Sequence, residues 1–178
     1  MTNKSDKYII SIMVDNEPGV LARVVGLFSG RGYNIESLSV SEVDSDKFLS
    51  RVTIVTSGTK IIVDQIKAQL NKLIPVHNLI DITQQDSFIA KEYILIKIKK
   101  NQKNQKKTFD IANKFNASIL SDQNNELILE MVGTSLNISK FIKLLRTFGI
   151  IELTRSGVVS MPIDSSFIKN SFKIKDKL

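Results

Sequence analysis

The feature that most constrains this chain is a change of hydrophobic period that occurs twice, in the same order. Alternating apolar residues predict strands, and apolar residues spaced three and four apart predict helices. In the first half of the sequence the order is strand, helix, two strands of a hairpin, helix and strand. The expected elements span residues 8–14, 18–30, 34–43, 48–56, 59–73 and 76–83. This order predicts a ferredoxin-like module built on one antiparallel sheet.

The second half of the sequence repeats the pattern. Its expected elements span residues 92–98, 108–115, 117–120, 126–132, 135–148, 150–154 and 158–161. We therefore predict an α+β fold of two consecutive ferredoxin-like (βαββαβ) modules, each with an antiparallel sheet and helices on one face. The predicted domains are residues 1–84 and 85–164, followed by a Lys-rich tail at 165–178 that we expect to be mobile.

Each predicted sheet leaves one face without helices, and that face carries apolar side chains. They are Ile9, Met13, Leu49 and Val55 in the first module, and Tyr93, Leu95 and Ile128 in the second. Domains this small bury only a modest fraction of their surface on their own. Apolar groups gathered on an open face favour a partner surface. We therefore expect the chain to form a homodimer.

The net charge of +7 is unevenly distributed along the 178 residues. Residues 1–80 carry 9 basic and 8 acidic side chains, and residues 81–178 carry 16 and 10. A basic surface can indicate nucleic-acid binding. The cations are mostly Lys, however, beside 25 Ile and 13 Asn, a mixture that coding bias alone can produce. Lys97 and Lys99 are expected on the outer face of the second sheet, where Glu126 and Glu130 would face them.

Composition excludes several classes of protein. The chain has no Cys, so disulfides, thiolate nucleophiles and Cys metal ligands are excluded. No apolar stretch approaches the roughly 18 residues of a membrane span. The polar segment 1–7 does not resemble a signal peptide. We expect a cytoplasmic protein without a membrane partner.

Catalytic and metal-binding chemistry has few candidates. The single histidine, His77, has no Ser, Asp or Glu at a useful spacing in the sequence, and it is interpreted as structural. Neither a G-x-x-x-x-G-K-[ST] loop nor a G-x-G-x-x-G opening of a helix is present. The acids near the first strand–helix turn, Asp15, Glu17, Glu36 and Glu42, have no metal-ligand spacing and are interpreted as solvated. We predict no catalytic residue, metal site or cofactor site in this chain.

The segment most informative about function leaves the first strand and opens the first helix. A helix N-terminus presents unpaired N–H groups and a partial positive charge, which suits a carboxylate. Gly19 would let a ligand approach the backbone, and the amides of Asn16 and Asn34 could hold the polar groups of an amino acid. Alternatively, Asn16 caps the helix and Asn34 only enters the next strand. The chemistry of the residues leaves both interpretations open.

A specific motif lies in this segment: N-E-P-G-V-L-A-R-V at residues 16–24, continued by G-L-F-S-G-R-G-Y-N-I-E-S-L at residues 26–38. It resembles the N-terminal ACT domain of the small, regulatory subunits of acetolactate synthase (acetohydroxyacid synthase). Further matches are S-R-V-T-I at 50–54, Q-I-K-A-Q-L at 65–70, Y-I-L-I-K-I at 93–98 and T-R-S-G-V-V at 154–159. The resemblance covers residues 8–161 and is to the two-domain bacterial form.

The resemblance implies a non-catalytic partner of the large catalytic subunit, which it activates and makes sensitive to feedback by valine in branched-chain amino-acid biosynthesis. Thiamine diphosphate, Mg and FAD would belong to that catalytic subunit. The implied valine site lies between two ACT domains, with the first loop from one protomer and the start of the second strand from its partner. On this sequence those positions are Asn16, Gly19, Val20, Leu21, Asn34 and Ile35. Ile35 and Val20 would receive the isopropyl group.

Two segments, 101–107 and 164–178, match no pattern of the family. The chain could instead be a free-standing ACT-type amino-acid sensor without an enzyme partner. Nucleic-acid binding is a third interpretation, since RNA-binding modules of this architecture stack bases on aromatic residues of the sheet. Tyr93 is a candidate for that role, but Ile128 and Glu130 occupy the neighbouring strand.

Overall fold

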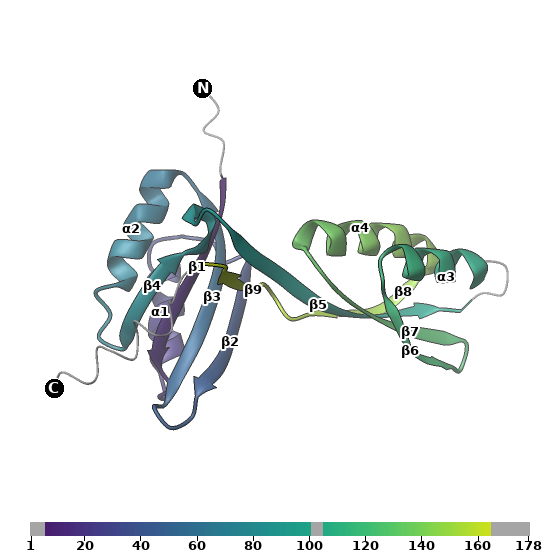
Figure 1. Cartoon of the computed structure of the whole chain (residues 1–178), viewed down its shortest axis with the longest axis horizontal. Coiled ribbons are helices and arrows are strands. Elements are labelled where there is room, and N and C mark those ends of the chain that lie inside the picture. The colour runs from purple at the N-terminus through teal and green to yellow at the C-terminus, as the bar shows by residue number, and fades with distance from the viewer. Residues whose placement is uncertain (1–5, 101–104, 165–178) are drawn as a thin grey trace. The chain divides into compact units, whose positions relative to one another are not determined.

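The computed structural model describes residues 6–100 and 105–164. The chain divides into two compact units (Figure 1). Unit 1 contains residues 6–89 and 158–164, and unit 2 contains residues 90–157. The tail predicted at 165–178 and most of the basic loop predicted at 101–107 lie outside the described residues. None of the described helices is long and apolar enough to cross a membrane.

Unit 1 is a ferredoxin-like module, as predicted. Its elements are β1 (Asp6–Asp15), α1 (Val20–Ser29), β2 (Ser37–Asp44), β3 (Leu49–Gly58), α2 (Lys60–Leu70) and β4 (Val76–Asp81), followed by a 3-10 turn at Ile82–Gln84. The strand order is β2-β3-β1-β4, and the neighbouring strands are antiparallel. Figure 1 shows β2 at one edge of this sheet.

The core of unit 1 forms between the sheet and its two helices. The inward residues of β1, Ile10, Ile12 and Val14, are at most 2% exposed. They pack with Val24 and Phe28 of α1, because residues four apart lie on one face of a helix. The period change in the sequence therefore identifies the core face correctly.

Helix α1 begins at Val20, two residues later than the sequence predicts. Gly19 precedes it with φ +85°, a left-handed conformation that glycine adopts readily. No side chain caps α1. The helices α2 and α4 differ, because Thr59 and Thr134 accept hydrogen bonds from the backbone N–H groups of Ile62 and Asn137.

The outer face of the unit 1 sheet is not an open surface, contrary to the sequence-based expectation. Met13, Leu49 and Val55 are at most 2% exposed. On this face the chain returns as β9 (Val159–Pro162), which pairs with the strand β5 (Phe88–Lys99). The apolar residues predicted to form a partner surface are therefore buried within the same chain, Ile9 in part.

Arg51 holds β9 on this face of the sheet. Its Nη2 donates to the backbone oxygen of Ser160 at 2.8 Å, and its Nε donates to Ser11 Oγ at 2.8 Å. The N–H of Val158 donates to Ser37 Oγ at 3.0 Å. Residues 158–164 thus belong to unit 1, and the first part of the chain extends to Ile89. The sequence placed this strand in the second domain and the boundary at residue 84.

Unit 2 is the second ferredoxin-like module. Its elements are β5, α3 (Gln105–Lys114), β6 (Ser118–Gln123), β7 (Glu126–Gly133), α4 (Ser135–Leu145), a 3-10 turn at Arg146–Phe148, and β8 (Ile150–Arg155). The strand order β6-β7-β5-β8 repeats that of unit 1. Ile94, Ile96 and Ile98 of β5 pack against Ala112 of α3 and Phe141 of α4. The predicted fold class is confirmed in both units.

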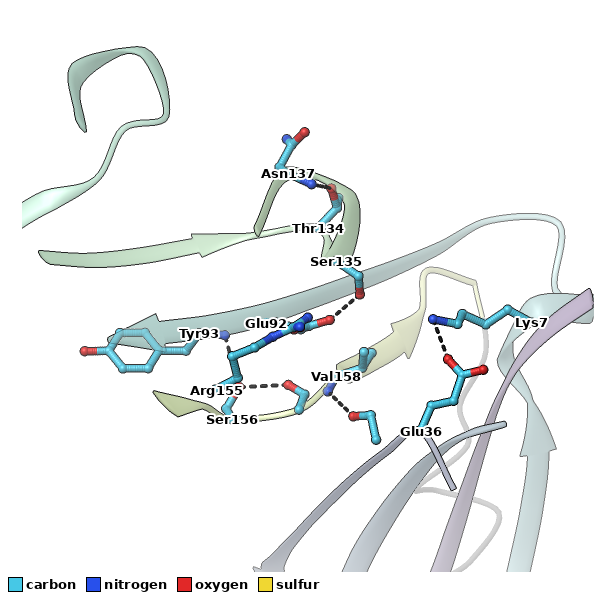
Figure 2. Close-up of polar contacts among 12 residues, drawn as sticks. Lys7, Glu36, Glu92, Tyr93, Thr134, Ser135, Asn137, Arg155, Ser156 and Val158 are labelled. Atoms are coloured by element: carbon cyan, nitrogen blue, oxygen red, sulfur yellow. Dashed lines mark hydrogen bonds and ion pairs between the residues drawn. The ribbon is translucent and has the colours of Figure 1, made fainter. Parts of the chain in front are cut away.

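A buried carboxylate connects three elements of unit 2, namely β5, α4 and β8. Glu92 of β5 is 3% exposed, and it accepts hydrogen bonds from Ser135 (Figure 2) and from Arg155. The Arg155 Nε lies 2.9 Å from Glu92 Oε2. A buried carboxylate needs such partners, because burial without them is costly.

On the outer face of the unit 2 sheet, some of the lysines lie beside acidic side chains. Lys99 lies opposite Glu126 in the register of β5 and β7, as predicted. Lys97 pairs instead with Glu152 of β8, at 3.3 Å between Nζ and Oε2. Glu130 accepts a hydrogen bond from the hydroxyl of Tyr93 at 2.8 Å, which raises the pKa of that phenol.

Replacing Arg51 by Met should release β9 from the sheet. The variant loses the bonds to Ser160 and Ser11, and we expect a loss of about 1–3 kcal/mol in the free energy of unfolding. Amide hydrogen exchange of residues 159–161 should accelerate about tenfold. Arg23→Met is the control, because Arg23 is exposed on α1. Equal exchange in the two variants would contradict the role of Arg51.

Two glycines of the α1 region should respond to Ala in opposite directions. A Cβ at Gly19 or Gly26 would meet nothing within 4 Å, so neither substitution is crowded. Gly19→Ala should lower the free energy of unfolding by about 1–2 kcal/mol, because φ +85° is strained for an L residue. Gly26→Ala, inside the helix, should raise it by about 0.5–1 kcal/mol. Urea unfolding of the two variants checks both signs.

Candidate functional site

The turn between β1 and α1 presents the backbone groups expected of an anion site. Gly19 leaves the first turn of α1 without a side-chain cap, and a helix start has N–H groups with no partner inside the helix. Val20 N–H reaches Glu17 O only at 3.3 Å. These groups and the helix dipole favour a carboxylate at Gly19–Leu21.

The two apolar residues of this turn have different surroundings. Val20 is 5% exposed and belongs to the core of unit 1. Leu21 is 41% exposed. The side chain of Val20 therefore packs in the core of unit 1, and its contact with a ligand stays a prediction. Leu21 offers the exposed apolar surface of this turn.

Asn16 is held by two contacts that cross the sheet. Its side-chain amide donates to Glu42 Oε2 at 2.7 Å, and its backbone N–H donates to Phe48 O at 2.6 Å. The sequence interpreted Glu42 as a solvated acid. The structure places it on β2, with its carboxylate beside the candidate site. The hairpin turn at residues 44–46 was the signal that could have placed Glu42 at this end of the sheet.

The second half of the predicted site lies elsewhere in the chain. Asn34 and Ile35 precede β2, and the backbone oxygen of Asn34 accepts a hydrogen bond from Thr56 Oγ1 at 2.7 Å. Ile35 is partly buried against the core of unit 1. Thr56 pairs with Tyr8 near the start of β1, whereas Leu49 pairs with Asp15 at its end. Seven residues of strand separate the two ends, a distance of about 20 Å.

One chain therefore does not bring the six predicted residues together. Asn16, Gly19, Val20 and Leu21 lie at one end of the sheet, and Asn34 and Ile35 lie at the other. The role of these residues in ligand binding stays a prediction. Their separation is a property of an antiparallel sheet, in which the loop after one strand and the segment before another can lie at opposite ends.

A hydrogen bond and an ion pair lie next to the two parts of the site. His77 Nε2 is 2.6 Å from Asp15 Oδ1, at the end of β1. The sequence offered no acidic partner for His77, because β4 and β1 become neighbours only in the sheet. At the other end, Lys7 Nζ is 2.6 Å from Glu36 Oε2 (Figure 2). Hydrogen bonds from Lys7 and Ser57 lower the pKa of Glu36.

The edge of β2 offers a place for a second chain. It is an edge strand, and residues 40–43 at its centre and end are exposed, including Val40 and Val43 at 41% each. An exposed strand edge carries N–H and C=O groups that another strand can pair. The end of β2 near Glu42 lies beside Asn16, and its start follows Asn34 and Ile35.

The sequence matches family models over both units. Residues 10–78 match the model described as an AHAS small subunit-like ACT domain, and residues 91–163 match the model described as the small subunit of acetolactate synthase. The two matched ranges correspond to unit 1 without β9 and to unit 2 together with β9.

Similar proteins carry the same description. The chain is 42% identical over 154 residues to the acetolactate synthase small subunit of Buchnera aphidicola subsp. Baizongia pistaciae, covering 86% of this chain and 96% of that protein. It is 41% identical over 155 residues to a probable acetolactate synthase small subunit of Archaeoglobus fulgidus, with 87% and 96% covered.

A solved structure agrees with the fold. The crystal structure of the acetolactate synthase small subunit of Thermotoga maritima has a TM-score of 0.81 and 29% sequence identity, covering 90% of this chain and 99% of that one. The resemblance stated from the N-E-P-G-V-L-A-R-V motif is thereby confirmed. The chain belongs to the acetolactate synthase small subunit family, with an ACT domain in its first unit.

Proposed function

We propose that the chain is a regulatory subunit that binds valine between two copies of its ACT domain and controls the catalytic subunit of acetolactate synthase. The observation that carries this proposal is the separation of the site residues to opposite ends of one sheet. A ligand that uses both groups needs a second chain. The family description supports the partnership with a catalytic subunit.

The free edge of β2 supports a two-fold arrangement of the two chains. If two β2 strands pair antiparallel around Val40, the end of one strand meets the start of the other. The start of the partner's β2, with its Asn34 and Ile35, then approaches Asn16 and Gly19 of the first chain. This pairing extends the sheet across the dimer, and it forms two equivalent sites.

The chemistry of such a site fits a branched-chain amino acid. The N–H groups at Gly19–Leu21 would bind the carboxylate. The carboxylate of Glu42 and the amide of Asn16 lie together at 2.7 Å, and they would receive the ammonium group. Leu21 and the partner's Ile35 would contact the isopropyl group. Selectivity against leucine or isoleucine should be limited, because one methylene changes binding by only about 1–3 kcal/mol.

Regulation follows if valine binds one arrangement of the dimer more tightly than another. The arrangement selected by valine would inhibit the catalytic subunit, and the other would activate it. In this proposal thiamine diphosphate, Mg and FAD belong to the catalytic subunit, and the small subunit changes their environment only through the contact between subunits. The complex would act in the cytoplasm.

Valine binding can be tested by calorimetry on the purified chain. Gly19→Asp should weaken binding at least tenfold, because it places a carboxylate where the ligand carboxylate would bind. Asn34→His should weaken it through the other half of the site. Lys106→Gln, at an exposed residue of α3 in unit 2, is the control. Equal valine affinity in all four proteins would refute the site.

A mixed dimer tests whether two chains share the site. In a dimer of one Gly19→Asp chain and one Asn34→His chain, one site carries both substitutions and the other carries neither. Co-purified mixed dimers should therefore recover about half the valine binding of the wild type. If each site lay within one chain, every site would carry one substitution and no binding would return.

Control of the enzyme is tested by adding the chain to the catalytic subunit from the same organism. We expect increased acetolactate formation and, with valine present, a decrease that Gly19→Asp abolishes. An unchanged rate would favour the alternative of a free-standing ACT-type amino-acid sensor. Nucleic-acid binding is disfavoured by the unit 2 sheet face, where Tyr93 is bonded to the carboxylate of Glu130.

A further inference from the structure

Unit 2 has a groove lined by lysines, and none of its lining residues belongs to the predicted valine site. It lies between α3, α4 and the end of β7, and its volume is about 720 Å³. Four lysines line it: Lys91, Lys114, Lys140 and Lys143. No Asp or Glu lies among its lining residues. The groove is thus a local concentration of positive charge.

These lysines lack the counter-charges that other lysines of the unit have. Lys97 pairs with Glu152, and Lys100 pairs with Asp122 at 2.5 Å. In the described part of the chain, none of the four groove lysines forms an ion pair. Like charges that surround one groove repel one another in the free protein, and an anionic partner would relieve that repulsion.

The helix dipoles explain the positions of only two of the four lysines. Lys114 and Lys143 lie in the last turns of α3 and α4, where a cation interacts favourably with the helix. Lys91 lies on β5, and Lys140 lies in the middle of α4, so neither has that explanation. The arrangement of all four around one groove therefore points to a ligand.

The groove also exposes apolar surface between the lysines. Val132 is 63% exposed, and Leu144 is 41% exposed. Phe115 is half-buried beside them. A small inorganic anion would leave this surface uncovered. An extended segment with an apolar side chain between carboxylates would use both kinds of lining group.

Two features argue against a dedicated phosphate site. The N-terminus of α4 borders the groove, but Thr134 already caps it by accepting from the N–H of Asn137 (Figure 2). The cations are all lysines, which act as separate point charges and lack the bidentate fork of arginine. Dispersed lysines suit several carboxylates along a chain better than one compact anion.

We propose that this groove docks an acidic segment of the catalytic subunit, with carboxylates against the four lysines and an apolar side chain between Val132 and Leu144. This inference rests on the proposed function, and it assigns unit 2 a role in assembly while unit 1 binds the effector. Charge pairs at the groove would speed association and determine the orientation of the complex.

The test measures the dissociation constant of the complex between the full chain and the catalytic subunit at three ionic strengths. Lys140→Gln with Lys143→Gln should raise it about tenfold at low salt, and the difference should shrink as salt screens the charges. Lys140→Arg with Lys143→Arg should bind like wild type. Lys60→Gln with Lys72→Gln removes the same charge from unit 1 and should leave the dissociation constant unchanged.

Several outcomes would overturn the groove assignment. One is an unchanged dissociation constant in the Lys140/Lys143 variant, and another is an equal loss in the Lys60/Lys72 control. Competition by inorganic pyrophosphate at constant ionic strength would instead identify a small-anion site. Retention on RNA that only the Lys140/Lys143 variant loses would identify a nucleic-acid surface.

The same measurements separate this inference from the proposed function. If the wild-type chain does not bind the catalytic subunit, the proposed function itself is wrong. If the wild type binds and the Lys140/Lys143 variant binds equally well, only the groove assignment is wrong. Valine calorimetry on that variant should match the wild type, because the groove lies in unit 2 and the predicted valine residues lie in unit 1.

Discussion

The alternation of side chains along β1 is the constraint on which unit 1 depends. This strand pairs with β3 on one side and β4 on the other. Ile10 and Ile12 therefore face the helices, while Ser11 and Met13 point to the opposite face, where Arg51 bonds both Ser11 and Ser160 of β9. A slip of one residue would exchange the two faces. The helices pack on one face and β9 is bonded to Arg51 on the other, whereas the edge strand β2 is exposed at residues 40–43.

In the proposed function, that constraint connects effector binding to the pairing of two chains. In the sheet, the loop after β1 and the segment before β2 lie at opposite ends. Within one chain, the two segments could meet only if a loop ran the whole length of the sheet. Antiparallel pairing of the edge strands of two chains would bring the two segments together at two equivalent sites. A site made in this way reports on the arrangement of the dimer, and a ligand that binds it biases that arrangement.

Much of the fold could be predicted, because hydrophobic period is a local property of the sequence. The order of elements, the core face of β1 and the two modules all follow from it. The placement of residues 158–161 could not be predicted in the same way. Their alternation indicates a strand, but their position on unit 1 depends on contacts such as Arg51 to Ser160. The partners of Lys97 and His77 likewise depended on which strands become neighbours.

The sequence by itself determined the fold class, the family motif and the residues of the candidate site. Only the tertiary structure decided that Asn16 and Asn34 lie at opposite ends of the sheet, that the side chain of Val20 belongs to the core, and that Glu42 approaches Asn16. The physical reason is distance along the chain. The hydrophobic period and the motif are set by residues that are close in the sequence. These contacts depend instead on strand order and register, which pair residues that lie tens of positions apart.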